Sequence, residues 1–185
     1  MTLKTNKIHP RNGIVAGATG GILQVVSATK TDQHHINSGS LTQGTKYDIT
    51  GLSAVITPTS TSSKILCMGH ISHNIKGGTQ GFFHLERNSS IVTGASGDAD
   101  GARLRCMVTG QLGTGSGYST WPVVTVPFSY VDSPASTSAQ TYQVQVSDAV
   151  GGSYDIYINR SIRAYAGTYY DASCTSTLIL MELSG

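Results

Sequence analysis

The segment Thr141-Tyr-Gln-Val-Gln-Val-Ser147 decides the fold class of this chain. It places Tyr142, Val144 and Val146 at every second position, with polar residues between them. Successive side chains of a strand point to opposite faces, so this spacing describes a strand with one buried face. A helix could not bury these three side chains on one side. The segment therefore predicts an all-β protein.

Similar segments recur along the rest of the chain. We expect strands at about 22–29, 45–49, 52–57, 64–73, 79–87, 101–109, 120–131, 140–147, 154–160 and 175–183. Segments rich in Gly, Ser, Thr and Asp separate them, and these residues favour turns. This spacing predicts an antiparallel jelly-roll sandwich of about 8–10 strands. An immunoglobulin-like sandwich is the weaker alternative, because the chain lacks the Cys…Trp…Cys framework of that fold.

Composition excludes several classes of function. Charged residues make up 12% of the chain and the formal net charge is +2, with the basic residues scattered, so we expect no nucleic-acid partner. No apolar run approaches the length of a membrane span, and we expect no membrane insertion. The first ten residues lack the apolar core of a signal peptide, which predicts synthesis in the cytoplasm.

The N-terminal region differs from the remainder of the chain. Residues 1–21 contain too little apolar sequence to form a core, whereas residues 22–185 carry the strand pattern of one jelly-roll domain. We therefore expect an extended N-terminal arm that lies against either the body of the domain or a neighbouring chain, and we favour another protein of an assembly. The basic and apolar residues expected to make this contact are Lys4, Lys7, Ile8, Arg11 and Ile14.

Histidine, aspartate and cysteine residues offer no convincing metal or cofactor site. His70 and His73 are three apart, so in a strand they face opposite sides, and His34-His35 reads as a loop. Asp98 and Asp100 resemble part of a calcium loop but lack its other ligands, which favours a turn. The cysteines Cys67, Cys106 and Cys174 lie in apolar segments and are expected to be buried thiols. We expect no metal and no cofactor.

Catalytic motifs are equally weak. The tract Gly113-Thr-Gly-Ser-Gly117 is not followed by the Lys-Ser/Thr pair of a phosphate-binding loop. No Gly-x-Ser-x-Gly nucleophile elbow occurs in a strand-turn-helix context, and the acidic residues are dispersed. We expect a protein that is not an enzyme.

Aromatic residues leave two interpretations open. A platform for stacking a sugar is one, and ordinary packing on a sheet or at a subunit interface is the other and stronger one. The residues of this possible glycan or receptor surface are Tyr118, Trp121, Tyr165, Tyr169 and Tyr170. In 154–158, the face carrying Asp155 and Tyr157 is expected to point to solvent or to an interface.

Several segments carry a resemblance to a known group. They include Leu3-Lys-Thr-Asn-Lys-Ile-His-Pro-Arg-Asn-Gly13, Ile49-Thr-Gly-Leu-Ser-Ala-Val-Ile-Thr-Pro58, Tyr130-Val-Asp-Ser-Pro134 and Leu178-Ile-Leu-Met-Glu-Leu183. With them the chain resembles small virion structural proteins of tailed bacteriophages, a group common in marine and cyanobacterial phages.

This resemblance implies a capsid decoration, cement or head-fibre protein on the virion surface, made in the host cytoplasm. It further implies a homotrimeric jelly roll similar to the heads of tumour necrosis factor and of the first complement component. The arm would then anchor on the major capsid protein or on another virion protein. The alternative implied role is a tail-fibre or receptor-binding tip that contacts a host-surface glycan. Neither role implies a catalytic residue.

Overall fold

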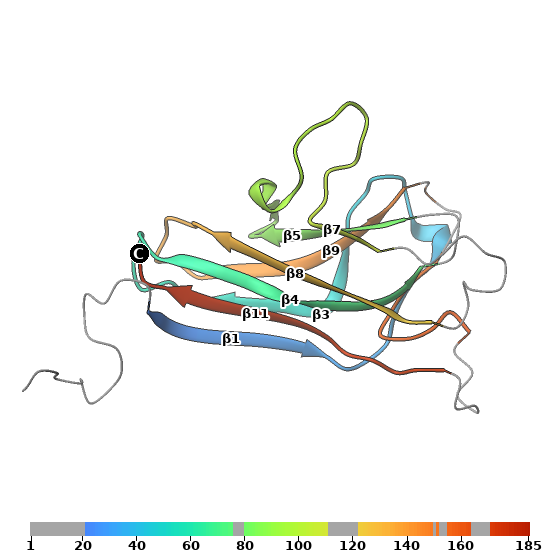
Figure 1. Cartoon of the computed structure of the whole chain (residues 1–185), viewed down its shortest axis with the longest axis horizontal. Helices are drawn as coiled ribbons and strands as arrows, with labels where there is room; N and C mark the ends of the chain where they lie inside the picture. The colour runs from blue at the N-terminus through green and yellow to red at the C-terminus, as the bar shows by residue number, and fades with distance from the viewer. Residues whose placement is uncertain (1–20, 76–79, 111–121, 150, 152–154, 164–170) are drawn as a thin grey trace, which may run out of the picture.

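The structure is a computed structural model, and it describes residues 21–75, 80–110, 122–149, 151, 155–163 and 171–185. These residues form 11 strands and two short 3-10 helices (Figure 1). The strands are β1 (Ile22–Lys30), β2 (His34–Ile36), β3 (Tyr47–Ile56), β4 (Lys64–Ile75), β5 (Gly81–Arg87), β6 (Ser90–Ile91), β7 (Val108–Gly110), β8 (Val124–Asp132), β9 (Gln140–Asp148), β10 (Ile156–Ile158) and β11 (Ser176–Leu183). The 3-10 helices are η1 (Ser38–Ser40) and η2 (Thr93–Ala95).

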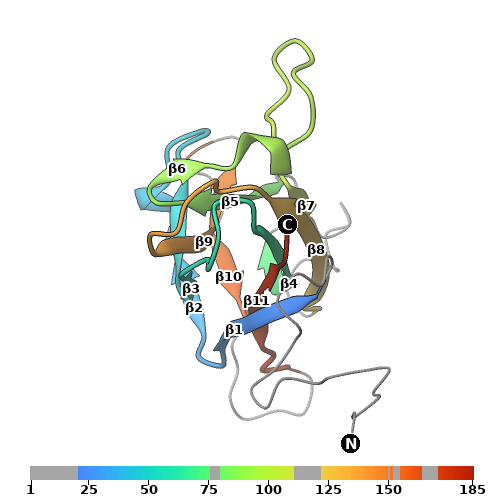
Figure 2. The same cartoon turned by 90° about the vertical axis from the view of Figure 1, so that its left-hand side faces the viewer.

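The strands form two antiparallel sheets that pack against each other (Figure 2). The first sheet has the order β1-β11-β4-β10-β2, and β8 pairs with the other edge of β4. The second sheet has the order β3-β9-β5-β6, and β7 also pairs with β5. Leaving aside the short strands β2, β6 and β10, the strand pairs are nested. The outermost pair is β1 with β11, followed by β3 with β9, β4 with β8 and β5 with β7. This nested pairing is the jelly roll expected from the sequence.

The core lies between the two sheets and contains the residues that decide the fold class. Tyr142, Val144 and Val146 of β9 are all fully buried, as their spacing predicts, although Gln145 and Ser147 on the other face of the strand are buried as well. Phe83 and Leu85 of β5 lie in the same core. Burial of such side chains stabilises the fold by about 1.5–3 kcal/mol each.

The largest differences from the expected strands lie at 45–57 and at 101–109. The expected strands 45–49 and 52–57 form a single strand, β3, whose register shifts between Asp48 and Ser53. Gly51 takes a positive φ of 86° within this irregularity, a conformation that favours glycine. In the expected strand 101–109, only Val108 and Thr109 are in a strand, β7, because residues 101–107 belong to a segment that projects from the second sheet (Figure 1).

A buried polar contact joins the two sheets near one end of β8. The carboxylate of Asp132 on β8 pairs with the guanidinium of Arg87 on β5. The hydroxyl of Tyr142 on β9 donates to the same carboxylate at 2.7 Å. Burial and the hydrogen bond to Asp132 raise the pKa of Tyr142 above its ordinary value. Two strands of the second sheet therefore hold one carboxylate of the first.

Candidate functional site

The site residues proposed from the sequence lie outside the described residues. The arm residues are Lys4, Lys7, Ile8, Arg11 and Ile14, and the aromatic residues are Tyr118, Trp121, Tyr165, Tyr169 and Tyr170. The structure therefore brings none of them into a described site. The features that follow are formed by other residues.

The outer face of the first sheet carries an apolar row that crosses four strands. Val25 on β1 is opposite Met181 on β11, Met181 is opposite Leu66 on β4, and Leu66 is opposite Val131 on β8. Val25 is 54% exposed and Val131 is 44% exposed, while the two central residues are half-buried. Neighbouring strands are about 4.8 Å apart, so the four side chains form a continuous apolar strip.

The next row of this face is also uncharged. Ile179 of β11 is opposite Met68 of β4, and Ser27 and Ser129 flank this pair on β1 and β8. We call these two rows the apolar face, defined by Val25, Met181, Leu66, Val131, Ile179 and Met68. Large contiguous apolar patches on a protein surface mark interaction sites.

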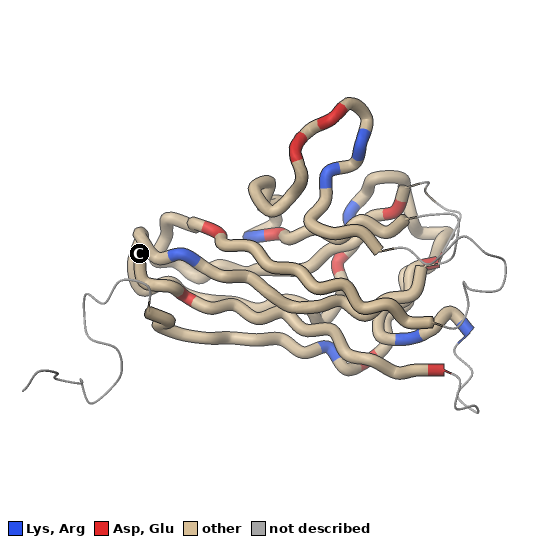
Figure 3. The backbone as a smooth tube through the Cα atoms, viewed as in Figure 1, with Lys and Arg blue, Asp and Glu red and all other residues tan. Residues whose placement is uncertain are grey.

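The charged residues of these four strands lie at or near the strand ends (Figure 3). Lys64 begins β4 and is exposed, whereas Glu182 near the end of β11 is fully buried. Burial alone would raise the pKa of Glu182, but hydrogen bonds, led by those from Thr59, hold the pKa below its ordinary value. The apolar face therefore keeps its centre free of charge.

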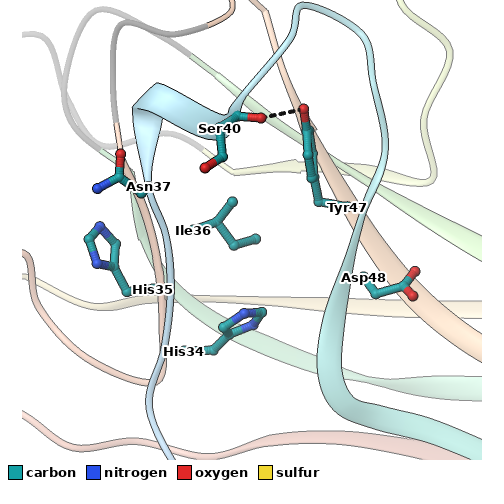
Figure 4. A pocket seen from close by; sticks show the side chains of 7 residues that line it. All are labelled: His34, His35, Ile36, Asn37, Ser40, Tyr47 and Asp48. Carbon is teal, nitrogen blue, oxygen red and sulfur yellow. Dashed lines mark hydrogen bonds between the residues drawn. The ribbon is translucent and has the colours of Figure 1, made fainter.

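A polar pocket of about 300 Å³ lies beside β2 and the start of β3 (Figure 4). Its lining residues are His34, His35, Ile36, Asn37, Ser40, Tyr47 and Asp48. The hydroxyl of Tyr47 donates to the backbone oxygen of Ser40 at 2.7 Å, which fixes one wall of the pocket. The volume lies at the lower end of the range for small-molecule sites.

One side of this pocket rests on a stacked aromatic pair. His35 on β2 is directly opposite Tyr157 on β10, and their rings stack with centroids 4.5 Å apart. Asp155 accepts hydrogen bonds from the hydroxyl of Tyr157 and from the backbone of Ser38, and the pKa of Asp155 falls to about 2 although burial opposes this shift. Arg160 lies over the Tyr157 ring, 4.6 Å from its centroid.

This arrangement corrects two expectations from the sequence. Tyr157 was expected to point to solvent or to an interface, but it is only 6% exposed because His35 and Arg160 cover its ring. His34 and His35 were expected in a loop, but they begin strand β2. Burial, together with the charge of Lys30, lowers the pKa of His34. The Nδ1 atom of His34 is buried and has no hydrogen-bond partner within the described part of the chain.

The other metal candidates remain apart. His73 is fully buried against Phe83, while His70 is half-buried on the outer face, as strand alternation predicts. Asp100 forms an ion pair with Arg103 at 2.8 Å in an exposed segment. Within the described ranges, no group of three His, Cys, Asp or Glu residues could hold a metal ion.

The cysteines only partly match their expected burial. All three belong to the described residues and are free thiols. Cys67 is buried in the core, and burial raises the pKa of its thiol. Cys106 and Cys174 are half-buried, so the expectation of buried thiols is wrong for these two. Cys106 lies between η2 and β7, and its backbone oxygen accepts a hydrogen bond from the backbone N–H of Gly97 at 3.2 Å.

Comparison with known proteins adds no relative. No protein-family model matches the chain, and no curated protein matches its sequence. Among the described residues, no helix is long and apolar enough to cross a membrane. Function must therefore be argued from the surfaces and pockets of the chain itself.

The sequence contained a signal for the apolar face. In Leu178-Ile-Leu-Met-Glu-Leu183 the apolar residues do not alternate with polar ones but occupy both faces of the strand. Such a pattern is typical of a strand that is covered on both sides. The polar pocket had no comparable signal. Its lining comes from one stretch of chain, His34 to Asp48, whose residues follow no strand alternation or binding motif.

Proposed function

We propose that this protein is a non-enzymatic structural protein of a bacteriophage particle that decorates the capsid as a homotrimer. The observation that carries the proposal is the apolar face, whose edge residues Val25 and Val131 are exposed in the single chain and whose centre carries no charge. The cores of protein interfaces are depleted of charged residues in the same way. The three copies pack these faces near a three-fold axis.

The assignment to a phage particle rests on the resemblance of the sequence to small virion proteins. In this proposal the N-terminal arm, residues 1–21, anchors on the major capsid protein or another virion protein, and the jelly roll projects from the virion surface. Low charge on the long strands fits a protein that works through assembly contacts (Figure 3).

A second candidate is a tail-fibre or receptor-binding tip that holds a host-surface glycan. The polar pocket favours it, because it combines the ring of Tyr47 with polar groups such as Asp48 in about 300 Å³. Sugar sites commonly pair an aromatic surface with a few hydrogen-bonding groups. This role is compatible with a trimer.

Two measurements test the first proposal. Light scattering at micromolar concentration should give three times the 19.4 kDa mass of the chain, and a monomeric mass would contradict the trimer. Immunogold labelling of purified particles should mark the head, whereas labelling of the fibre tip would favour the second candidate. A chain lacking residues 2–20 should remain folded and trimeric but fail to join particles. Normal incorporation of this truncated chain would place the anchor on the body.

A further inference from the structure

A second cavity lies on the outer face of the second sheet and has a cationic lining. It measures about 170 Å³ and lies between the start of β3, the middle of β5 and the segment that follows β6. Its lining residues are Lys46, His84, Ile91, Thr93, Ser96 and Arg105. Two of these six side chains carry a positive charge, two carry a hydroxyl, and none carries a carboxylate.

His84 lines this cavity, and its ring carries a polar atom without a partner among the described residues. The residue is 2% exposed, and its Nε2 lies 2.9 Å from the hydroxyl oxygen of Ser147. Its Nδ1 is buried and has no hydrogen-bond partner in the portion of the chain that the structure describes. Buried polar atoms of native proteins are nearly always paired, so an unpaired one requires an explanation such as a bound group.

The protonation of His84 suits a hydrogen-bond donor. Burial and the nearby charge of Lys46 lower the pKa of His84 to about 4, so the ring is neutral at neutral pH and carries one N–H. When the hydroxyl of Ser147 donates to Nε2, that N–H resides on Nδ1. The ring then offers a donor to a ligand that accepts.

Arg105 is held in place at the rim of the cavity. Its Nε donates to the backbone oxygen of Gly97 at 2.6 Å, and its Nη2 donates to that of Thr93 at 3.5 Å. These contacts orient the guanidinium without neutralising its charge. Donor groups on Nη1 remain for a ligand, and a guanidinium matches the geometry of an oxyanion.

Neighbouring carboxylates do not line the cavity. Lys46 forms no ion pair with any described residue. Asp48, two residues along the strand, accepts a hydrogen bond from Gln145 at 2.7 Å and belongs to the polar pocket instead. Glu86 is two residues from His84 on β5 and is likewise absent from the lining. The positive charge of the cavity is therefore not neutralised from within.

We propose that this cavity binds a tetrahedral oxyanion, a sulfate or phosphate group, through Arg105, Lys46 and the Nδ1–H of His84. A water molecule occupies about 30 Å³ of liquid, so the cavity holds such a group together with a few waters. The group is either a free ion or a substituent of a saccharide, which present the same chemistry. The proposal does not depend on the trimer, because the cavity lies on the sheet opposite the apolar face.

The test is a titration of the full chain with sodium sulfate, followed by NMR of the histidine rings at constant ionic strength. We expect saturable shifts of the His84 ring, a fixed Nδ1–H tautomer and a rise in its pKa, while sodium chloride gives none of these. The absence of a saturable response at 100 mM sulfate and at 100 mM phosphate would overturn the proposal.

Matched variants separate a site from general surface charge. Arg105→Gln and Lys46→Gln should each weaken sulfate binding about tenfold, as expected for loss of a charge-assisted hydrogen bond. Arg103→Gln is the control, since Arg103 lies on the same segment, is 82% exposed and pairs with Asp100. It should change the affinity less than twofold. Equal losses for Arg103→Gln and Arg105→Gln, with unchanged melting temperatures, would contradict the site.

A sulfated disaccharide and its unsulfated form distinguish the two sources of the group. If the sulfated sugar binds more tightly than free sulfate, and if Arg105→Gln abolishes this difference, the group is a substituent of a saccharide. Binding of free sulfate alone assigns an ion site. Binding of the unsulfated sugar with equal affinity would show that the oxyanion is not what the cavity recognises.

Discussion

The outer faces of the two sheets obey the same alternation of inward and outward residues but differ in chemistry. The first sheet presents the apolar face, with Val25 and Val131 exposed and with its charged residues near the strand ends. The second sheet presents the polar side chains of His84, Gln145 and Ser147, which are buried, and His84 and Ser147 are hydrogen-bonded to each other. The first face is apolar and exposed at Val25 and Val131, while the second is polar and buried around His84 but exposed at Val55.

This contrast shows that the outer face of a sheet can be apolar and exposed or polar and buried within the same fold. An apolar outer face lowers its free energy when another chain covers it, since removal of apolar area from water is favourable. A polar face covered by its own chain needs internal hydrogen-bond partners, and each unpaired group has a cost of about 1–3 kcal/mol. The first face is therefore suited to assembly and the second to holding a small polar group.

The largest expected effect is the loss of assembly when a charge enters the apolar face. Val25→Lys should convert the trimer to a monomer at micromolar concentration, because a buried unpaired ammonium costs several kcal/mol in each subunit. Val55→Lys is the matched control, since Val55 is 53% exposed on the second sheet. Light scattering measures both. If the trimer persisted in Val25→Lys but was lost in Val55→Lys, the subunit interface would lie on the second sheet and not on the apolar face.

Acid should destabilise the chain through two buried histidines. Burial lowers the pKa of His73 and of His84 to about 4, against 6.5 for an exposed ring. Between these values the unfolded chain binds more protons, so stability present above pH 6.5 is lost as the pH falls towards 4. The loss reaches about 3 kcal/mol for each ring.

Urea denaturation at several pH values measures this loss of unfolding free energy. Variants of the core histidine then show how much of the loss is due to His73 and how much to His84. His73→Leu removes a ring that has no hydrogen-bond partner among the described residues, and it should reduce the acid loss by about half. His70→Leu is the control, since His70 is half-buried on the outer face. This variant should lose as much stability in acid as the unaltered chain, because His73 and His84 are still present. An unchanged acid loss in His73→Leu would show that His73 is not the cause.

A smaller effect is expected where the two sheets are joined. Arg87→Met leaves the carboxylate of Asp132, whose side chain is 9% exposed, without its cation, and should lower the free energy of unfolding by about 2–3 kcal/mol. Arg103→Met breaks an exposed pair with Asp100 and should cost less than about 0.5 kcal/mol. Chemical denaturation compares the two, and equal losses would contradict the structural role of the buried pair.

The smallest effect concerns a single polar contact on the second sheet. Gln145→Met removes the hydrogen bond to Asp48, whose carboxylate remains exposed to water. The expected loss of unfolding free energy is about 0.5–1 kcal/mol. A calorimetric loss above about 2 kcal/mol would mean that the polar face contributes more to stability than its individual contacts indicate.

The sequence predicted most of the long strands because their signal is local. The alternation of Tyr142, Val144 and Val146 identified β9 and its buried face. The prediction of a strand at 101–109 is wrong for residues 101–107. Their composition resembles that of a strand, but no described strand pairs with them. Strand β2 was missed for the opposite reason, since its three residues are extended only through pairing with β10.

The sequence by itself determined the all-β class, the antiparallel jelly roll and the two-sided apolar character of β11. Each of these depends on side-chain spacing along a strand, which is fixed by backbone geometry. Only the tertiary structure aligned Val25, Met181, Leu66 and Val131 in one row, because strand register decides which residues lie side by side. It alone also brought Lys46, His84 and Arg105 around one cavity, since these residues come from three separate parts of the chain and meet only when the sandwich packs.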